Sequence, residues 1–407
     1  MEFRNLTPFS VMCYQMLDKS DNASHVVTMK VGFRLVKVAD GQYRPEIMDQ
    51  DPLPLCISDE YRGELNSSSV LQESDLAPFK PACDVIINAT GYAPGGKPCT
   101  VFPVGVKLST ADGSLLLDKH LLINGERQLN RQLSGQWQLT DPVPFTSLSL
   151  DYCYSFGGEC VIHSEDEKSA SRIPSEYRLT NAQLADHPEP DHPPVAHTVC
   201  ASNPLGLGYT EPWYIDATKV KTLAVPRILS ITKPMKSFHF HQIVDGSVDF
   251  NAPEYQPAGF GIIGRSWLPR LAKAGTYDQH WLDHRHPYLP HDFDFSYWNG
   301  APVDQQIPFP TSDLTLELTN LTPEGQTVIL LPHHLALILL RLNNGSILPQ
   351  PMLMDTLLID LENMIIAQTW RYVATTALPV RVMEARYEVR PEMIAEKLLP
   401  HREKAHG

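Results

Sequence analysis

Histidines and aspartates crowd one stretch of the chain. The set comprises His280, His284, His286, His291, Asp278, Asp283 and Asp292. Neutral imidazoles and carboxylates are ligands for zinc and other divalent ions. The spacing matches no standard metal motif, and prolines and glycines interrupt the stretch. We therefore expect no bound metal or other cofactor, and a metal-dependent hydrolase that uses His280–His291 stays an alternative.

Two further sequence patterns resemble those of functional sites but do not meet the structural requirements of such sites. Gly259–Gly264 fits G-x-G-x-x-G, but Pro257 and Pro269 flank it where a dinucleotide site needs a strand and then a helix. We interpret it as a glycine-rich turn. Phe238–His241 predicts a strand with both histidines on one polar face. The sequence has no P-loop, H-E-x-x-H or G-x-S-x-G motif, so we predict that the protein is not an enzyme and has no catalytic residue.

Aromatic residues gather between residues 267 and 298, with arginines among them. Protein interfaces are enriched in Trp, Tyr and Arg. The predicted partner-binding residues are Trp267, Arg270, Tyr277, Trp281 and Trp298. An aromatic core with loops packed around it is the alternative interpretation. A carbohydrate-binding β-sandwich, with tryptophans as stacking platforms, is a third hypothesis for the function.

The overall charge limits the class of partner. Lys and Arg total 33 against 47 Asp and Glu, a formal net charge of -14. This charge repels nucleic acid and anionic lipid, so a basic protein partner is favoured. The N-terminal residues include Glu2 and Arg4 and no apolar run, which predicts a cytoplasmic protein. The longest aliphatic run, Leu335–Leu340, is far shorter than the roughly 20 residues of a membrane span. Seven cysteines without a C-x-x-C pair predict buried, reduced thiols.

Hydrophobic periodicity predicts a mainly β protein. Residues 25–38 alternate apolar and polar side chains, as in a half-buried strand. Three hairpins are predicted from apolar runs separated by turn residues: 102–108 with 115–123, 314–318 with 328–331, and 356–359 with 364–367. We expect antiparallel sheets in a sandwich-like arrangement, with long proline-rich loops and few short helices, among them a short turn at Trp267–Ala274.

Changes in composition along the chain predict its organisation. The stretch from about residue 158 to 209 is polar and rich in proline, which is typical of an insertion or hinge. The predicted division is 1–159, an N-terminal β region; 160–209, a polar insertion or hinge; 210–390, a C-terminal β region; and 391–407, a short helix or tail.

An ordered series of short strings resembles a former domain-of-unknown-function family encoded beside the spike genes of type VI secretion systems. In the first half the strings are Asn5-Leu-Thr-Pro-Phe9, Ser74-Asp-Leu-Ala-Pro-Phe-Lys-Pro81, Asp84-Val85, Tyr92-Ala-Pro-Gly-Gly96, Phe156-Gly-Gly158 and Asn203-Pro-Leu-Gly-Leu-Gly208. In the second half they are Pro257-Ala-Gly-Phe-Gly261, Trp267-Leu-Pro-Arg270, Ala274-Gly-Thr-Tyr-Asp278, Trp281, Leu289-Pro-His-Asp-Phe-Asp294, Leu321-Thr-Pro-Glu-Gly325, Asp355-Thr356 and Trp370-Arg371. Residues 160–200 match nothing in it, and Asn88–Thr90 departs from its pattern.

This resemblance implies an effector adaptor or chaperone. Such a protein binds a toxin effector in the cytoplasm and promotes its loading onto the VgrG or PAAR spike protein. The strings are rich in residues that build turns, so we expect them to maintain the scaffold while the insertion and the sheet edges select the cargo. Pairing of an exposed edge strand with an effector segment, and shielding of a basic toxin by the acidic surface, are the two binding hypotheses.

Overall fold

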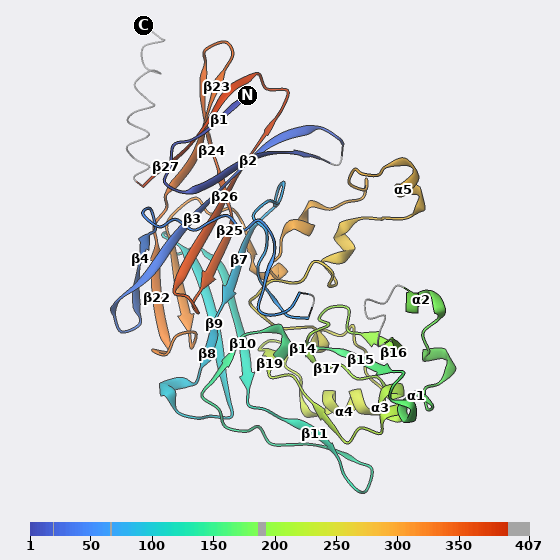
Figure 1. Ribbon diagram of the computed structural model, residues 1–407. Coiled ribbons are helices and arrows are strands. Elements are labelled where there is room, and N and C mark those ends of the chain that lie inside the picture. The colour runs from blue at the N-terminus through green and yellow to red at the C-terminus, as the bar shows by residue number, and fades with distance from the viewer. Residues whose placement is uncertain (19, 66, 186–192, 390–407) are drawn as a thin grey trace.

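The protein is mainly β, as the sequence predicts. The computed structural model describes residues 1–389 except residues 19, 66 and 186–192 (Figure 1). Strands make up 42% and helices 14%, which confirms the predicted class. The predicted helix or tail at 391–407 lies outside the described residues. None of the described helices is long and apolar enough to cross a membrane.

One large curled sheet forms most of the core. Its strands in spatial order are β19 (Ile228–Ser230), β10 (Leu115–Asn124), β9 (Val101–Thr110), β21 (Leu314–Thr319), β22 (Gln326–Leu331), β4 (Gln42–Ile47), β3 (Ala23–Ala39), β26 (Ile365–Thr375), β25 (Leu353–Asp360), β7 (Cys83–Asn88) and β20 (Gln306–Ile307), and β2 (Ser10–Leu17) pairs with β3. The predicted hairpins are confirmed as β9–β10, β21–β22 and β25–β26, all antiparallel.

Strand β3 confirms the predicted element but not its predicted exposure. Val27 and Met29 lie in the core with no exposed surface, as the alternating pattern requires. The other face was expected to meet solvent, and that expectation is wrong, because Thr28 and Lys30 are also buried. A polar strand face is buried at low cost only when its polar groups find partners. Those partners come from a segment near residue 75, which crosses this face.

A second sheet extends the core. It contains β1 (Glu2–Asn5), β27 (Val380–Glu388), β23 (Leu335–Leu342) and β24 (Ile347–Pro351) in that order. Strand β1 runs parallel to β27, whereas the other pairs are antiparallel. Ile338 and Met383 join the same hydrophobic cluster as Val27. The two sheets therefore share one core.

Gln305 bridges strands near the two ends of the large sheet, and we call this junction the seam. Gln305, in the 3-10 turn η7 (Val303–Gln305), has no exposed surface. Its Nε2 donates to the carbonyl oxygens of Val85 on β7 at 2.7 Å and of Phe260 at 2.9 Å. Its Oε1 accepts a hydrogen bond from Lys119 of β10 at 2.7 Å. Residues 259–264, interpreted from the sequence as a glycine-rich turn, form an irregular segment with a bend at Phe260 and Gly261 and with η4 (Pro253–Tyr255), not a strand, before it.

A smaller lobe carries most of the helices (Figure 1). It contains β11 (Gln128–Arg131), β12 (Trp137–Leu139), β14 (Phe156–Gly157), β15 (Glu159–His163), β16 (Pro194–Val199), β17 (Leu207–Gly208), β18 (Thr222–Ala224), α1 (Glu167–Ala170), α2 (Asn181–Ala185), α3 (Pro212–Thr218) and α4 (Ser237–Asp245). Cys160 and Ile162 of β15 pack with Trp213 of α3 in one cluster. Part of the predicted insertion thus shares a core with the segment that follows it.

The predicted strand at Phe238–His241 is wrong, because these residues lie in helix α4. Phe240 and Ile243, three positions apart, share the buried side of the helix. Gly246 ends it with a φ of 78°, in the left-handed conformation that glycine adopts readily. The alternation of Phe and His repeats every two residues, as in a strand, whereas the helix that contains it repeats every about 3.6 residues.

Short elements complete the chain. They are β5 (Glu60–Tyr61), β6 (Val70–Gln72), β8 (Thr90–Tyr92), β13 (Ser147–Ser149), η1 (Pro94–Gly96), η2 (Tyr152–Tyr154), η3 (Ser175–Tyr177), η4 (Pro253–Tyr255), η5 (Leu271–Ala274), η6 (Phe295–Trp298) and α5 (Gln279–His284). Turn η5 confirms the short turn expected within Trp267–Ala274.

Candidate functional site

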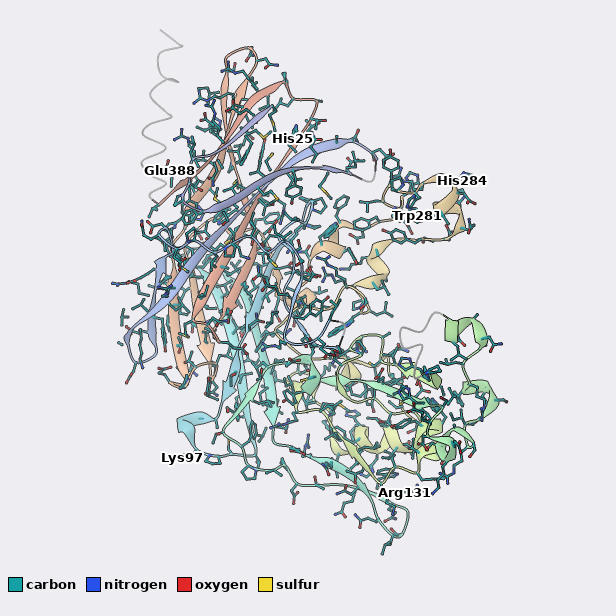
Figure 2. All side chains as sticks on the ribbon, viewed as in Figure 1. His25, Lys97, Arg131, Trp281, His284 and Glu388 are labelled. Carbon is teal, nitrogen blue, oxygen red and sulfur yellow. The ribbon has the colours of Figure 1, made fainter. Side chains whose placement is uncertain are left out.

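Tyr277, the most exposed residue of the predicted binding set, lies with Trp281 on a projecting segment, residues 271–292, which we call the arm. Figure 1 shows helix α5 at its far end, away from the large sheet, and Figure 2 labels Trp281 and His284 on it. Tyr277 is 53% exposed, and its ring meets that of Trp281 edge to face with centroids 4.7 Å apart. The arm therefore exposes Tyr277, which packs against the half-buried Trp281.

Local hydrogen bonds give the arm a defined shape. The Asp278 carboxylate begins α5 by accepting the backbone N–H of Trp281 at 2.8 Å. The Trp281 indole N–H donates to the carbonyl oxygen of Tyr288 at 2.9 Å. Asp292 accepts the backbone N–H of Thr276 at 3.0 Å and its hydroxyl at 2.7 Å. These bonds tie the two sides of the arm together and hold Trp281 in place.

The arm also contacts the turn between β2 and β3. Arg285 Nη1 lies 2.7 Å from the Asp21 carboxylate, and Arg285 Nε donates to the carbonyl oxygen of Leu289 at 2.7 Å. One arginine thus closes the arm on itself and joins it to the hairpin.

Two of the predicted binding residues belong to the interior instead. Trp267 is 6% exposed and packs edge to face against Tyr152, with ring centroids 5.5 Å apart. Arg270 is 3% exposed and forms two hydrogen bonds to Glu73, at 2.6 and 3.0 Å. Both anchor the base of the arm. Trp298 is half-buried beneath Arg265, whose guanidinium carbon lies 5.6 Å from the ring centroid.

The histidines of the arm do not assemble into a ligand set. His280 and His284 lie on successive turns of α5 with ring centroids 4.7 Å apart and ring planes tilted by 58°. In the described part of the chain, no group of three or more His, Cys, Asp or Glu side chains is placed to hold a metal ion. The His and Asp residues of the arm are therefore close together in sequence but do not converge on one point in space.

The arm carries three carboxylates as well as the aromatic pair. Among the described residues, no Lys or Arg lies within ion-pair distance of Asp278, Asp283 or Asp292. Hydrogen bonds from the backbone N–H and the hydroxyl of Thr276 lower the pKa of Asp292 below its usual acidic value, so they favour its ionised form. The arm consequently combines apolar rings with negative charge, a combination that favours cationic side chains of a partner.

A network of buried charges, which sequence reasoning missed, covers the polar face of β3. Lys30 Nζ lies 2.9 Å from the Asp75 carboxylate, which also accepts the hydroxyl of Thr369 at 2.9 Å and the backbone N–H of Cys56 at 2.7 Å. Nearby, Lys80 Nζ lies 2.9 Å from Asp84. Each carboxylate is satisfied by several donors, as buried charges must be.

Arg371 joins several strands within this network. Its Nε donates to Asp355 at 2.6 Å, and its Nη1 lies near Tyr14, Thr28 and the carbonyl oxygen of Ala77, at 2.8, 2.6 and 2.5 Å. Burial opposes the charge of Arg371, but the Asp355 carboxylate together with Tyr14 and Asp75 outweighs burial and raises the pKa. The side chain thus ties β26, β25, β3, β2 and the crossing segment together.

The network leaves no room for a substrate. The cavity that it encloses has a volume of about 20 Å³, the space of about one water molecule. Its lysines, arginines and carboxylates neutralise each other. The sequence did contain a sign of this network. Charged residues lie among apolar or turn-forming residues in Ser74–Pro81 and at Asp84, Asp355 and Arg371. We assign the network to the scaffold.

A second cavity lies beside the seam of the large sheet. It has a volume of about 390 Å³ and is lined in part by Lys119, His120, Tyr152, Pro257 and Asp304. Lys119 pairs with Asp304 at 2.8 Å. His120 pairs with Asp118 at 2.9 Å. Each of these side chains is thus held by a carboxylate of the cavity wall.

Comparison with known proteins places this arrangement in a family. The model of a family described as uncharacterized proteins conserved in bacteria, DUF2169, matches residues 21–371. The chain belongs to this family. The DUF2169 match begins in the β2–β3 turn and ends at Arg371, so it covers the arm and every member of the buried network except Tyr14. No curated protein and no solved structure matches the chain.

Proposed function

We propose that the protein is an effector adaptor of a type VI secretion system. In this proposal it binds a toxin effector in the cytoplasm and promotes the loading of that effector onto the VgrG or PAAR spike protein. The ordered strings from Asn5 to Arg371 that resemble the adaptor family support it. The burial of many of those residues in one scaffold agrees with a protein whose work is binding.

The arm is the observation that carries the proposal. Leu271, Tyr277, Leu282 and Tyr288 are 47%, 53%, 53% and 43% exposed. Clustered exposed apolar side chains mark binding surfaces on soluble proteins. The arm is anchored through Arg270 in the interior, so binding would not need to order it first, which reduces the entropic cost of association.

The charge of the surface favours a basic partner segment. The net charge is -14, and the three arm carboxylates have no Lys or Arg partner in the described part of the chain. Arginine and lysine side chains of an effector would meet both the carboxylates and the aromatic rings here. A cationic toxin is therefore the cargo that fits this surface best.

The two alternative functions have less support. A metal-dependent hydrolase would need ligands that converge, and the arm histidines do not. A carbohydrate-binding protein would use exposed tryptophans as platforms, whereas all six tryptophans are buried or half-buried. No specific observation favours either function over partner binding.

Affinity purification of the tagged chain from its native bacterium tests the proposal. We expect a toxin effector together with VgrG or PAAR among the recovered proteins, identified by mass spectrometry. Tyr277→Ala should reduce the recovery of the effector without unfolding the chain. Phe238→Ala is the matched control, because Phe238 is 54% exposed on α4, far from the arm in sequence. Failure to recover either an effector or a spike protein would contradict the proposal.

A further inference from the structure

Strand β2 leaves one edge of the large sheet open. Strand β3 pairs along one edge with β26, and along the other edge first with β2 and then with β4. Strand β2 has β3 as its one strand neighbour in the described part of the chain. No backbone hydrogen bond from residues 11–17 to any other described segment is present. Its outer edge therefore faces away from the sheet.

The residues that expose their backbone can be identified from the register. Asp18 N–H donates to the Asn22 carbonyl oxygen at 3.1 Å, next to the pair Leu17–Ala23. Hydrogen-bonded and non-hydrogen-bonded pairs alternate along an antiparallel ladder. Even-numbered residues of β2 thus bond to β3, and the odd-numbered ones point outward. The outward set is Val11, Cys13, Gln15 and Leu17.

This edge lacks the protection found elsewhere in the molecule. Edge strand β24 carries Pro349 and Pro351, and proline has no N–H to offer to an added strand. Strand β2 contains neither proline nor a charged residue over Ser10–Leu17, and its side chains Met12 and Leu17 are 36% and 39% exposed. Soluble proteins usually protect such edges because unprotected ones recruit other strands.

We propose that the outer edge of β2 binds an extended segment of the effector, which adds to the large sheet as a further strand. This inference rests on the proposed function and names the mode of binding. Backbone hydrogen bonds to the four outward residues give the affinity, and apolar side chains of the segment cover Met12 and Leu17. Such a strand leads towards the β2–β3 turn, where Asp21 contacts the arm through Arg285.

Charge selects an effector segment over a second copy of this chain. Two copies with a net charge of -14 each repel one another. Basic residues that follow the added strand instead reach the arm, whose carboxylates have no Lys or Arg partner in the described part of the chain. The strand edge and the arm then form one continuous binding surface, apolar along β2 and acidic beyond the turn.

The test uses a substitution that changes one outward backbone donor. Gln15→Pro removes an N–H that points away from β3 and keeps the internal ladder intact, because proline is compatible with an edge position. Gln15→Ala changes the same exposed side chain but keeps the N–H. The affinity of each variant is measured against the effector that co-purifies with the wild-type chain, and folding is checked by circular dichroism and thermal unfolding.

We expect Gln15→Pro to weaken effector binding about tenfold and Gln15→Ala to leave it nearly unchanged, since one hydrogen bond is worth roughly 1 kcal/mol and adjacent bonds are strained by the ring. Hydrogen exchange should slow at residues 11, 13, 15 and 17 in the complex. Equal binding by both variants, without slower exchange, would refute strand addition while the adaptor function stands. A dimer of the chain alone that Gln15→Pro dissociates would assign the edge to a second copy. A chain that binds no effector overturns this inference and the proposed function together.

Discussion

Arg270 and Glu73 form a two-point ion pair inside the protein, with Nη1–Oε1 and Nη2–Oε2 distances of 2.6 and 3.0 Å. Burial opposes ionisation of Glu73, but the guanidinium groups of Arg270 and Arg265 outweigh burial and lower the pKa of the carboxyl. The pair fastens the base of the arm to the segment that covers β3. Residues on the buried side of this pair maintain the scaffold, whereas exposed residues of the arm are available to bind a partner.

Glu73→Gln should destabilise the protein substantially. The substitution leaves Arg270 buried without its counter-charge, and breaking a buried pair in this way costs about 3–5 kcal/mol. The free energy of unfolding in urea measures the effect. The control is Glu46→Gln, which removes an exposed carboxylate paired with Arg44 and should change stability little. Similar stability of both variants would show that the Arg270 pair is not important for the fold.

The same carboxyl predicts a dependence on acid. Because the pKa of Glu73 is lower in the folded chain than the ordinary value of 4.5, its contribution to stability is complete above pH 4.5. That contribution declines as the pH falls from 4.5 through the folded pKa. The stability difference between wild type and Glu73→Gln should therefore narrow in this range. A difference that stays constant down to the acid unfolding of the wild type would contradict the assignment.

Gln305→Leu should weaken the seam of the large sheet. The variant removes the donor to Val85 and Phe260 and leaves Lys119 without one acceptor, so we expect a loss of about 1–3 kcal/mol. Thermal unfolding measures it. Gln138→Leu, at an exposed position of β12, is the control and should unfold like the wild type. An unchanged melting temperature for Gln305→Leu would show that the sheet closes without this bridge.

Several cysteines should be unreactive in the native chain. Burial raises the pKa of Cys56, Cys153 and Cys160 to about 12 and that of Cys83 well above its usual value. Because the thiolate is the reactive form, a disulfide reagent at pH 8 should modify these four slowly until denaturant is added. Peptide mapping of the modified sites checks this order. Rapid labelling of Cys83 in the native protein would contradict its buried position.

The sequence was sufficient to predict the strands whose side chains alternate strictly. Residues 25–38 and the three hairpins depend on local periodicity and on turn residues such as Gly113 and Gly325, so no distant contact was needed to find them. Helix α4 was missed because its buried residues, Phe240 and Ile243, are defined by contacts with the smaller lobe.

The binding residues were predicted only in part, for a physical reason. Trp267 and Trp281 are equal as residue types, and composition does not distinguish a ring packed on Tyr152 from one on an exposed arm. The charge network was missed because Lys30 and Asp75 meet across separate segments, and a polar strand face ordinarily indicates solvent. Long-range pairing decides both cases.

Charge on the arm should contribute to partner binding. Asp283→Asn removes one carboxylate that has no Lys or Arg partner among the described residues, and we expect a slower association with the effector, by a few-fold, that depends on salt. Stopped-flow or biosensor measurements at two ionic strengths separate this effect from packing. Asp141→Asn, on an exposed site between β12 and β13, serves as the control. Association insensitive to both the substitution and the salt would rule out electrostatic steering by the arm.

Secretion of the effector tests the adaptor function most directly. The co-purifying toxin is quantified in the culture medium of the native bacterium with the gene for this chain deleted, restored, or restored as Tyr277→Ala, alongside a second effector that does not bind the chain. We predict that deletion abolishes export of the bound toxin alone, that the wild-type gene restores it, and that the variant restores it poorly. Unchanged export of that toxin after deletion would contradict the account.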